Sequence, residues 1–378
     1  MAETGAEIGV GLVGYKFMGR AHSTAYRQVR HFFPVDPAPR MRVICGRSES
    51  AVRAAADSLG WEEHCTDYRS LLERDDVGLV DICASGEVHR EVALAALRAG
   101  KHVLCEKPLA NTLDEAREMR EAAGEAGTVA MVCFNYRRSP AVQLASALVR
   151  EGRLGEIRHW RAVYLQDWLL DPALPMSWRL RKETAGSGAL GDIGSHLVDL
   201  AHFLVGPITE VVGLAENFIG ERPREGDGAA GTDRVTVDDA AAFLARFASG
   251  ATGTFEATRL APGRKAYESF EINGSNGSVV FNLERLNELQ VCFADDPADV
   301  SGFRTVLVTE PGHPYVGAWW PPGHIVGYEH TFVHTVKDLL DGIGSGRSPA
   351  PTFDDGYRCQ AVLDAVERSI EDRGWVRV

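Results

Sequence analysis

Ile8-Gly9-Val10-Gly11-Leu12-Val13 is a short apolar run that leads directly into Gly14-Tyr15-Lys16-Phe17-Met18-Gly19. A strand, a turn with spaced glycines and then a helix form the setting of a dinucleotide fingerprint, because the helix N-terminus can face a pyrophosphate. Lys16 stands where the middle glycine of the usual pattern would be, so its ammonium either contacts phosphate or points into solvent. The stretch predicts nucleotide binding, with a plain strand–helix turn as the alternative. The expected contacts are Gly14, Lys16, Phe17, Met18 and Gly19.

The first third of the chain alternates apolar strands with helices. Strands are predicted at residues 8–13, 41–45, 79–84, 102–105 and 129–134, and helices at 18–30, 51–59, 88–99 and 113–126. Short strands without polar alternation, each followed by a helix, indicate a parallel sheet covered on both faces. The pattern therefore predicts that residues 1–135 form a doubly wound dinucleotide-binding domain whose ligand lies beyond the carboxyl ends of the strands.

The pattern changes to a strand-rich one in residues 136–378. Strands are expected at residues 157–165, 210–215, 240–247, 252–257, 268–272, 278–282, 288–293 and 304–309, and helices at 141–150, 190–204, 329–340 and 356–371. Asn273-Gly274 and Asn276-Gly277 are turn signals between strands. These features predict a second α/β domain with a large open, mainly antiparallel sheet. Residues 220–233, rich in glycine and charge, are expected to be a surface loop.

Composition narrows the possible partners. The 378 residues are 45% hydrophobic and 25% charged, and the net charge is −13. This acidity disfavours nucleic acid or an anionic membrane as a partner. The acidic N-terminal residues 1–7 are unlike a signal peptide. The seven scattered cysteines fit buried thiols, so a cytoplasmic location is expected.

The end of the second strand bears on the choice of cofactor. An acidic residue there would hold the ribose hydroxyls of NAD, but this chain has Gly46-Arg47-Ser48. Arg47 can pair with a 2′-phosphate through its planar guanidinium, and Ser48 can donate a hydrogen bond. NADP is therefore slightly favoured over NAD. Glu49 could still serve a ribose, and Arg47 stacked on adenine would suit either cofactor.

Two further motifs carry polar groups suited to catalysis. Glu106-Lys107-Pro108 ends the strand at 102–105, and the residue before a proline is held extended, so Lys107 is expected at the ligand-binding edge. Asp192 and His196 lie four residues apart on one face of a predicted helix, among closely spaced glycines. The structural alternatives are a surface lysine for Lys107 and, for the other pair, a solvated helix face or a capping aspartate with a core histidine.

The order of these motifs resembles the glucose–fructose oxidoreductase, inositol dehydrogenase and rhizopine-catabolism (Gfo/Idh/MocA) family. The resemblance rests on the glycine turn, Glu106-Lys107-Pro108 and Gly191-Asp192-x-Gly194-x-His196-x-x-Asp199, and residues 134–138 and 164–168 are similar to a bacterial subgroup. It implies a Rossmann domain, an oligomer formed through the open sheet (a homodimer or homotetramer), and Lys107, Asp192 and His196 at the catalytic site. Ser85-Gly86 stands where members often have Pro-Asn, whereas His89 is kept. Glu106, Ser85 and His89 are further expected cofactor contacts.

The same interpretation assigns a polyhydroxylated substrate. Aromatic faces pack on sugar C–H groups, and forked donors bind neighbouring hydroxyls. The candidate substrate contacts, besides Asp192 and His196, are Tyr136, Arg137, Gln166, Trp168 and Arg179, although ordinary strand and loop packing explains each of them singly at least as well. No metal is expected: His330 and His334 have helical i, i+4 spacing, but the glutamate of a zinc-protease motif does not follow His330.

Together these patterns predict a dehydrogenase that uses NADP or NAD and acts on a secondary hydroxyl of a sugar, anhydrosugar, glycoside or inositol. His196 is expected to act as general base, Lys107 to stabilise the alkoxide, and Asp192 to orient the substrate. A redox-cycling, NAD-dependent glycosidase would use the same residues. A non-catalytic sensor of nucleotide or sugar is a second alternative.

Overall fold

The computed structural model describes residues 6–226 and 231–378. Two compact units account for the chain: the first comprises Met1–Arg138 with Gly327–Tyr357, and the second Ser139–Val326 with Arg358–Val378. The sequence placed one boundary at residues 135/136, whereas the first unit also takes in a segment near the C-terminus. That segment adds helix α9 (Tyr328–Ser345) and a bridge between Met131 and Thr352. Each helix in the described residues is too short or too polar to cross a bilayer.

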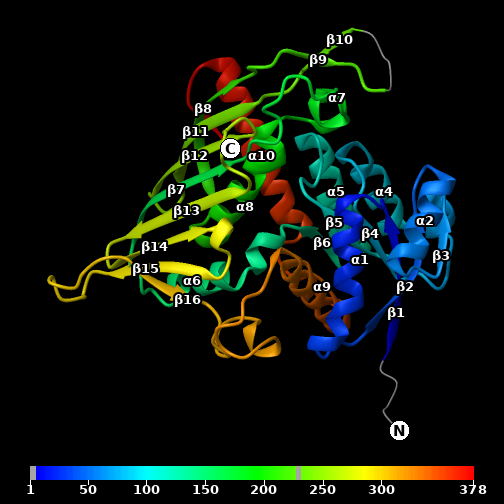
Figure 1. The fold of residues 1–378 in the computed structure, drawn as a ribbon, viewed down its shortest axis with the longest axis horizontal. Helices are drawn as coiled ribbons and strands as arrows, with labels where there is room; N and C mark the ends of the chain where they lie inside the picture. The colour runs from blue at the N-terminus through cyan, green and yellow to red at the C-terminus, as the bar shows by residue number, and fades with distance from the viewer. Residues whose placement is uncertain (1–5, 227–230) are drawn as a thin grey trace. The chain divides into compact units, whose positions relative to one another are not determined.

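The first unit is built on a six-stranded parallel sheet. Its strands are, in spatial order, β3 (Glu63–Cys65), β2 (Ala38–Cys45), β1 (Glu7–Val13), β4 (Leu79–Ile82), β5 (His102–Glu106) and β6 (Ala130–Cys133). The connecting helices are α1 (Phe17–Phe32), α2 (Glu49–Leu59), α3 (Tyr68–Leu72), α4 (Gly86–Arg98) and α5 (Leu113–Ala126), and a 3-10 turn follows at Asn135–Arg138. Figure 1 shows these strands with their helices around them. The strand order reverses between β1 and β4, and in such sheets ligands bind beyond the strand ends at that point.

The second unit contains a nine-stranded sheet. Its order is β16 (Arg304–Leu307), β15 (Glu288–Phe293), β14 (Gly277–Asn282), β13 (Tyr267–Gly274), β7 (Ile157–Leu165), β12 (Thr252–Thr258), β11 (Ala240–Phe247), β8 (Ile208–Glu216) and β17 (Val376–Arg377). All neighbours are antiparallel except β7 and β12. The predicted fold class is therefore confirmed, with one parallel pair inside the mainly antiparallel sheet.

One face of this sheet is packed and the other is open. Burial alternates along β11 and β12, and their inward rings Phe243 and Phe255 stack 4.3 Å apart. Trp160 and Phe270 stack at 5.1 Å on the same side. The helices of this unit are α6 (Pro140–Arg150), α7 (Lys182–Ala185), α8 (Ser195–Leu204) and most of α10 (Phe353–Asp372), with 3-10 turns at Trp178–Leu180, Leu283–Arg285 and Val316–Ala318. Helices α6 and α8 pack on the sheet. On the outer face, Leu244 remains 49% exposed.

The structure differs from the sequence-based predictions in two local segments. The helix expected at residues 190–204 begins with a π-helical turn, Leu190–Gly194, before α8. In the expected loop 220–233, β9 (Glu221–Pro223) and β10 (Thr232–Arg234) pair as a hairpin, while residues 227–230 lie outside the described residues. The expectation that the N-terminus is unlike a signal peptide concerns residues 1–7, of which residues 1–5 also lie outside the described residues.

Candidate functional site

The glycine turn after β1 packs closely against the end of β2 and the loop that follows β4. Gly14 has a φ of 106°, and its N–H donates to the Cys45 carbonyl at 2.9 Å. A Cβ on Gly14 would lie 2.7 Å from the Cys83 carbonyl oxygen, and one on Gly19 would lie 2.2 Å from the Gly14 oxygen. Only glycine fits both positions.

The helix that follows this turn offers an electropositive end. Lys16 is exposed at the N-cap of α1, and the first turn of α1 has no acidic residue. Phe17 is 65% exposed, and its ring stacks on Tyr328 at 6.2 Å. Met18 is half-buried. Because a helix N-terminus favours anions, this arrangement can accept a phosphate group.

The end of β2 is basic on its exposed side. Arg47 and Ser48 are both exposed, and Ser48 is the N-cap of α2. Glu49, the nearest acid, is held by Arg53 at 2.8 Å and His64 at 2.9 Å. Those two hydrogen bonds, His64 first, lower the pKa of Glu49. The acid that could have served a ribose is therefore engaged by Arg53 on its own helix and by His64 on β3.

His89 ties together the loops that follow β4 and β5. Its Nδ1 lies 3.0 Å from the Pro108 carbonyl and its Nε2 lies 3.1 Å from the Ala84 carbonyl. Burial lowers the pKa of His89, while the two carbonyl contacts act in the opposite direction. Ser85, the N-cap of α4, instead donates through its hydroxyl to Glu87 at 3.2 Å. His89 thus supports the loop that carries Lys107, while Ser85 stays at the surface.

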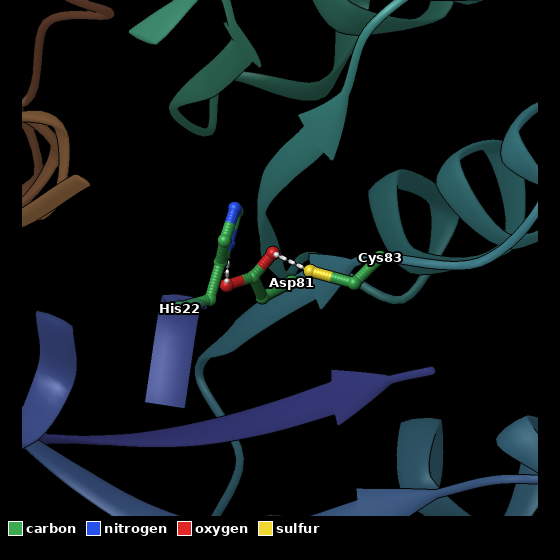
Figure 2. A group of neighbouring side chains, drawn as sticks. All are labelled: His22, Asp81 and Cys83. Atoms are coloured by element: carbon green, nitrogen blue, oxygen red, sulfur yellow. Dashed lines mark hydrogen bonds and ion pairs between the residues drawn. The ribbon is translucent and has the colours of Figure 1, made fainter. Parts of the chain in front are cut away.

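Glu106, next to Lys107 in the chain, belongs to a buried charge cluster that the sequence patterns did not reveal. His22 on α1 contacts Asp81 on β4 through Nδ1 at 2.8 Å and Glu106 through Nε2 at 2.9 Å. Figure 2 shows the His22 ring and the Cys83 thiol converging on the Asp81 carboxylate. The other oxygen of Glu106, Oε2, accepts the Lys107 N–H at 3.1 Å. A charged residue inside the apolar run Leu79-Val80-Asp81-Ile82 was the available signal.

Asp238 fixes the backbone that carries Asp192 and His196. Its carboxylate accepts the N–H groups of Gly188 at 2.6 Å and Leu190 at 2.8 Å. A Cβ on Gly188 would lie 1.8 Å from the Asp238 carbonyl oxygen, so this approach needs glycine. The π-helical turn then places Asp192 before α8, which carries His196. π-Helical turns of this kind occur frequently at functional sites.

A buried arginine holds the Asp192 carboxylate. Arg259, with a 1% exposed side chain, places Nη1 3.5 Å from Oδ2 of Asp192, which is 28% exposed. Arg259 also donates through Nη2 to the Asp238 carbonyl at 3.1 Å. Its guanidinium carbon lies 5.9 Å from the Trp168 ring centre, and Trp168 Nε1 donates to Gln166 at 2.9 Å. The structure thus brings Asp192, Trp168 and Gln166 together around a residue that the sequence did not single out.

The remaining substrate candidates lie in different settings. His196 is buried, and its ring lies 6.0 Å from that of Tyr164. In the first unit, Tyr136 packs 6.3 Å from Tyr328, and Arg137 is buried in an ion pair with Asp355 at 3.3 Å. Arg179 lies over Trp178 at 4.4 Å. Lys107 belongs to the first unit, and Asp192 and His196 belong to the second.

The C-terminal histidines serve local structure. His334 Nδ1 lies 2.9 Å from the Arg138 carbonyl, and burial lowers the pKa of His334 to about 3. His330 Nδ1 accepts the Gly327 N–H at 3.0 Å. Within residues 6–226 and 231–378, the side-chain groups with metal-compatible spacing both contain His22: one adds Asp81 and Cys83, the other Glu106 and Cys133. Hydrogen bonds already account for the short contacts of His22 in both.

Comparison with known proteins agrees with these two units. A family described as "Oxidoreductase family, NAD-binding Rossmann fold" matches residues 8–134, and "GFO/IDH/MocA C-terminal domain" matches residues 142–280. Levoglucosan dehydrogenase of Pseudarthrobacter phenanthrenivorans is 45% identical over 98% of both chains. A solved oxidoreductase domain protein from Kribbella flavida has a TM-score of 0.96, 54% identity and 99% coverage of both chains. Levoglucosan dehydrogenase in complex with NADH and levoglucosan has a TM-score of 0.95 and 45% identity, covering 98% of this chain and 99% of that one.

The resemblance noted in the sequence is confirmed at the level of the family, the fold and the dehydrogenase class. The first unit is an NAD-binding Rossmann domain. The chain therefore belongs to the Gfo/Idh/MocA family of NAD(P)-dependent oxidoreductases.

Proposed function

We propose that this protein oxidises a secondary hydroxyl of a sugar or anhydrosugar and transfers the hydride to NAD or NADP. The observation that carries the proposal is the likeness to levoglucosan dehydrogenase along almost the whole chain. The set formed by Asp192, Trp168 and Gln166 supports it, because an indole face and polar side chains suit a compact polyol. Levoglucosan is accordingly the first candidate substrate.

Each candidate catalytic residue has a separate role in this proposal. His196 accepts the proton of the reacting hydroxyl as a general base. The Lys107 ammonium stabilises the alkoxide as it develops. Asp192, held by Arg259, accepts a hydrogen bond from a neighbouring hydroxyl and orients the sugar. Of the other proposed sugar contacts (Tyr136, Arg137, Gln166, Trp168 and Arg179), Arg137 is the weakest, since Asp355 already engages it.

The turn at Gly14 fits a dinucleotide. Its exposed cation and acid-free helix N-terminus form an anion-accepting donor set. Gly14, Lys16, Phe17, Met18 and Gly19 would hold the pyrophosphate, and Arg47 and Ser48 the adenosine ribose. Ser85, His89, Glu106 and Lys107 would border the nicotinamide, with His89 acting through the loops that it joins. When bound, the cofactor supplies the hydride acceptor.

The test is a substrate panel. Purified protein is incubated with NAD or NADP and with levoglucosan, other sugars, glycosides or inositols, while reduced cofactor and sugar products are measured. Accumulation of reduced cofactor with an oxidised sugar supports the proposal. Release of an aglycone without net reduction would instead identify the redox-cycling glycosidase. If the protein binds nucleotide or sugar but turns over no member of the panel, the non-catalytic sensor is the remaining interpretation.

Cofactor choice gives a first prediction. We expect the wild type to bind NADH and NADPH with Kd values within about tenfold, since Arg47 and Ser48 replace the ribose-binding acid. Arg47→Asp should weaken NADPH binding by roughly 10–100-fold, the size of a lost charge-assisted contact, and leave NADH within about threefold. Fluorescence titration measures both constants. Arg98→Asp, which changes an exposed arginine in the last turn of α4, is the control. Exclusion of NADPH by the wild type would contradict the prediction.

Arg259 gives a second prediction. Arg259→Met removes the cation beside Asp192, so kcat/KM for the sugar should fall roughly 10–100-fold, about 1.4 kcal/mol for each factor of ten. The Kd for NADH should stay within about twofold, because Arg259 is not among the proposed cofactor contacts. Arg138→Met removes an equally buried arginine that pairs with Asp338 and serves as the stability-matched control. Equal kcat/KM losses in both variants would refute the assignment.

Assembly and location complete the proposal. The open face of the nine-stranded sheet, with Leu214 59% and Leu244 49% exposed, supports a homodimer or homotetramer formed through that face. The seven thiols suit a reducing cytoplasm. Light scattering of the wild type and of Leu214→Lys/Leu244→Lys tests the assembly: dissociation of the variant is expected.

A further inference from the structure

His22, Tyr26, Asp81 and Glu106 form a buried polar group under the strand ends of the first unit, called here the His22 cluster. His22 is 1% exposed, Asp81 0% and Glu106 4%. Besides the two contacts of His22, the Tyr26 hydroxyl donates to Asp81 Oδ2 at 2.9 Å. Ionisable side chains are almost never this buried unless they are paired. The protonation states of these side chains therefore depend on one another.

The contacts of His22 determine its protonation. Both ring nitrogens lie within 2.9 Å of carboxylate oxygens, which can only accept when they are ionised. A neutral imidazole has a single N–H and would leave one nitrogen lone pair against a carboxylate. Burial lowers the pKa of His22, but the charge and hydrogen bond of Asp81 together with the neighbouring Cys83 and Cys133 outweigh it, and the net pKa lies well above 6.5. His22 is thus an imidazolium.

Among residues 6–226 and 231–378, the other groups recorded around this imidazolium are neutral. Burial raises the pKa of Tyr26 on α1 and of Cys83 after β4, and it raises the pKa of Cys133 on β6 to about 12. Helix α9 contributes the Phe332 ring, 5.2 Å from that of His22. Glu106 itself stays ionised: burial raises its pKa, but the hydrogen bond and charge of His22 outweigh this and bring it below the usual value.

The cluster is joined to Lys107 through one carboxylate. Glu106 gives Oε1 to His22 and Oε2 to the Lys107 N–H. We propose that His22 is a positioning residue for the reaction: its positive charge, shared between Asp81 and Glu106, orients Glu106 and thereby fixes the backbone from which the Lys107 side chain projects. This inference rests on the role proposed for Lys107.

The charges of the His22 cluster and of Lys107 balance one another. Asp81 and Glu106 carry two negative charges, and His22 and Lys107 carry two positive charges. His22→Gln leaves two carboxylates with one cation, so Glu106 takes up a proton or swings away and its hold on the Lys107 N–H weakens. Adding Asp81→Asn removes the surplus negative charge. In that double variant the introduced asparagine amide can donate to the introduced glutamine, whose own amide can donate to Glu106, so the contact that holds Glu106 is restored without the charge pair.

The experiment is a double-mutant cycle on the full-length protein with its sugar and cofactor. We expect His22→Gln to lower kcat roughly 10–100-fold by misplacing Lys107, with the Kd for NADH within about twofold. His22→Gln/Asp81→Asn should recover at least about half of that loss on a logarithmic scale. His334→Gln, which removes another fully buried histidine, should leave kcat within about twofold. A merely structural role predicts the reverse: a double variant as slow as His22→Gln or slower. That result would overturn the proposal.

A second measurement does not depend on turnover. Because the folded-state pKa of His22 is raised above its unfolded value near 6.5, its stabilisation is complete below that pH and is lost as pH rises through the folded pKa. The urea midpoint of the wild type should therefore fall more steeply above pH 6.5 than that of His22→Gln. Identical slopes would overturn the imidazolium.

The wild type alone supplies a check if the variants fail to fold. Histidine-labelled NMR should show one imidazole that stays doubly protonated at a pH at which the other imidazoles have become neutral, and its absence would overturn the inference. The proposed function is tested separately by Lys107→Ala. If that variant keeps full turnover, the role of Lys107 fails, while the pH slopes and the NMR signal still report on the protonation of His22.

Discussion

Lys107→Ala should lower kcat for sugar oxidation by roughly 10²–10⁴-fold, the range for losing an electrostatic or acid–base contribution. The ammonium is proposed to stabilise an alkoxide that exists only during the reaction, so the Kd for NADH should stay within about threefold. His196→Ala should cause a loss of the same order through removal of the general base. Steady-state kinetics with a confirmed substrate and fluorescence titration with NADH measure the two quantities.

Matched controls exist on the same elements. Lys101 precedes β5 at the end opposite Lys107, and its Nζ donates to the Arg74 carbonyl at 2.9 Å. His202 lies on α8 with His196. Lys101→Ala and His202→Ala should both keep kcat within about threefold, since neither is assigned a role in the reaction. Near-normal turnover in His196→Ala would remove the base assignment and make Lys107 the next candidate for that role.

Gly14→Val should raise the Kd for NADH by roughly 100-fold or more and leave little activity at ordinary cofactor concentrations. Gly14 sits at φ 106°, and its Cβ would meet the Cys83 carbonyl at 2.7 Å, so the turn must open and move the N-terminus of α1. Both the strained conformation and the backbone collision act at once.

Gly100→Val separates those two effects. Gly100 also has a positive φ, 69°, but a Cβ there would meet nothing within 4 Å. This variant should lose about 1–2 kcal/mol of unfolding free energy from backbone strain and keep its NADH affinity. Titration of the two folded variants, with thermal unfolding alongside, makes the comparison. If both bind NADH as the wild type does, the Gly14 turn is not the pyrophosphate site.

The elements that could be predicted from sequence are those with strong local signals. Helix α5 has the predicted bounds, because the Thr112–Glu115 capping box starts it and Gly127 ends it in the left-handed conformation. The central parallel strands could be recognised as apolar runs. In contrast, β3 is only Glu63-His64-Cys65, a polar segment that becomes a strand through its pairing with β2. Nothing local encodes such pairing.

The residues of the candidate site also divide into those with local sequence signals and those without. The motifs that contain Gly14, Lys107, Asp192 and His196 could be found because glycine, proline and i, i+4 spacing have local meaning. Arg259 could not, since an arginine is ordinarily a surface residue, and this buried one contacts Asp192 and Trp168, which are distant in sequence. The His22 cluster likewise joins side chains from α1, β4 and β5. Asp81 alone, in an apolar strand, hinted at a buried partner.

The interleaved division of the chain has a consequence for biosynthesis. The first unit is completed only by Gly327–Tyr357, and the second only by Arg358–Val378. A chain emerging from the ribosome therefore cannot finish its N-terminal half first, as proteins with consecutive domains generally do. Strand β7 must also wait for both of its neighbours, β12 and β13, while β8 and β11 are made. A premature stop before residue 327 would leave both halves incomplete, with unpaired strand edges exposed to aggregation and to quality-control proteases.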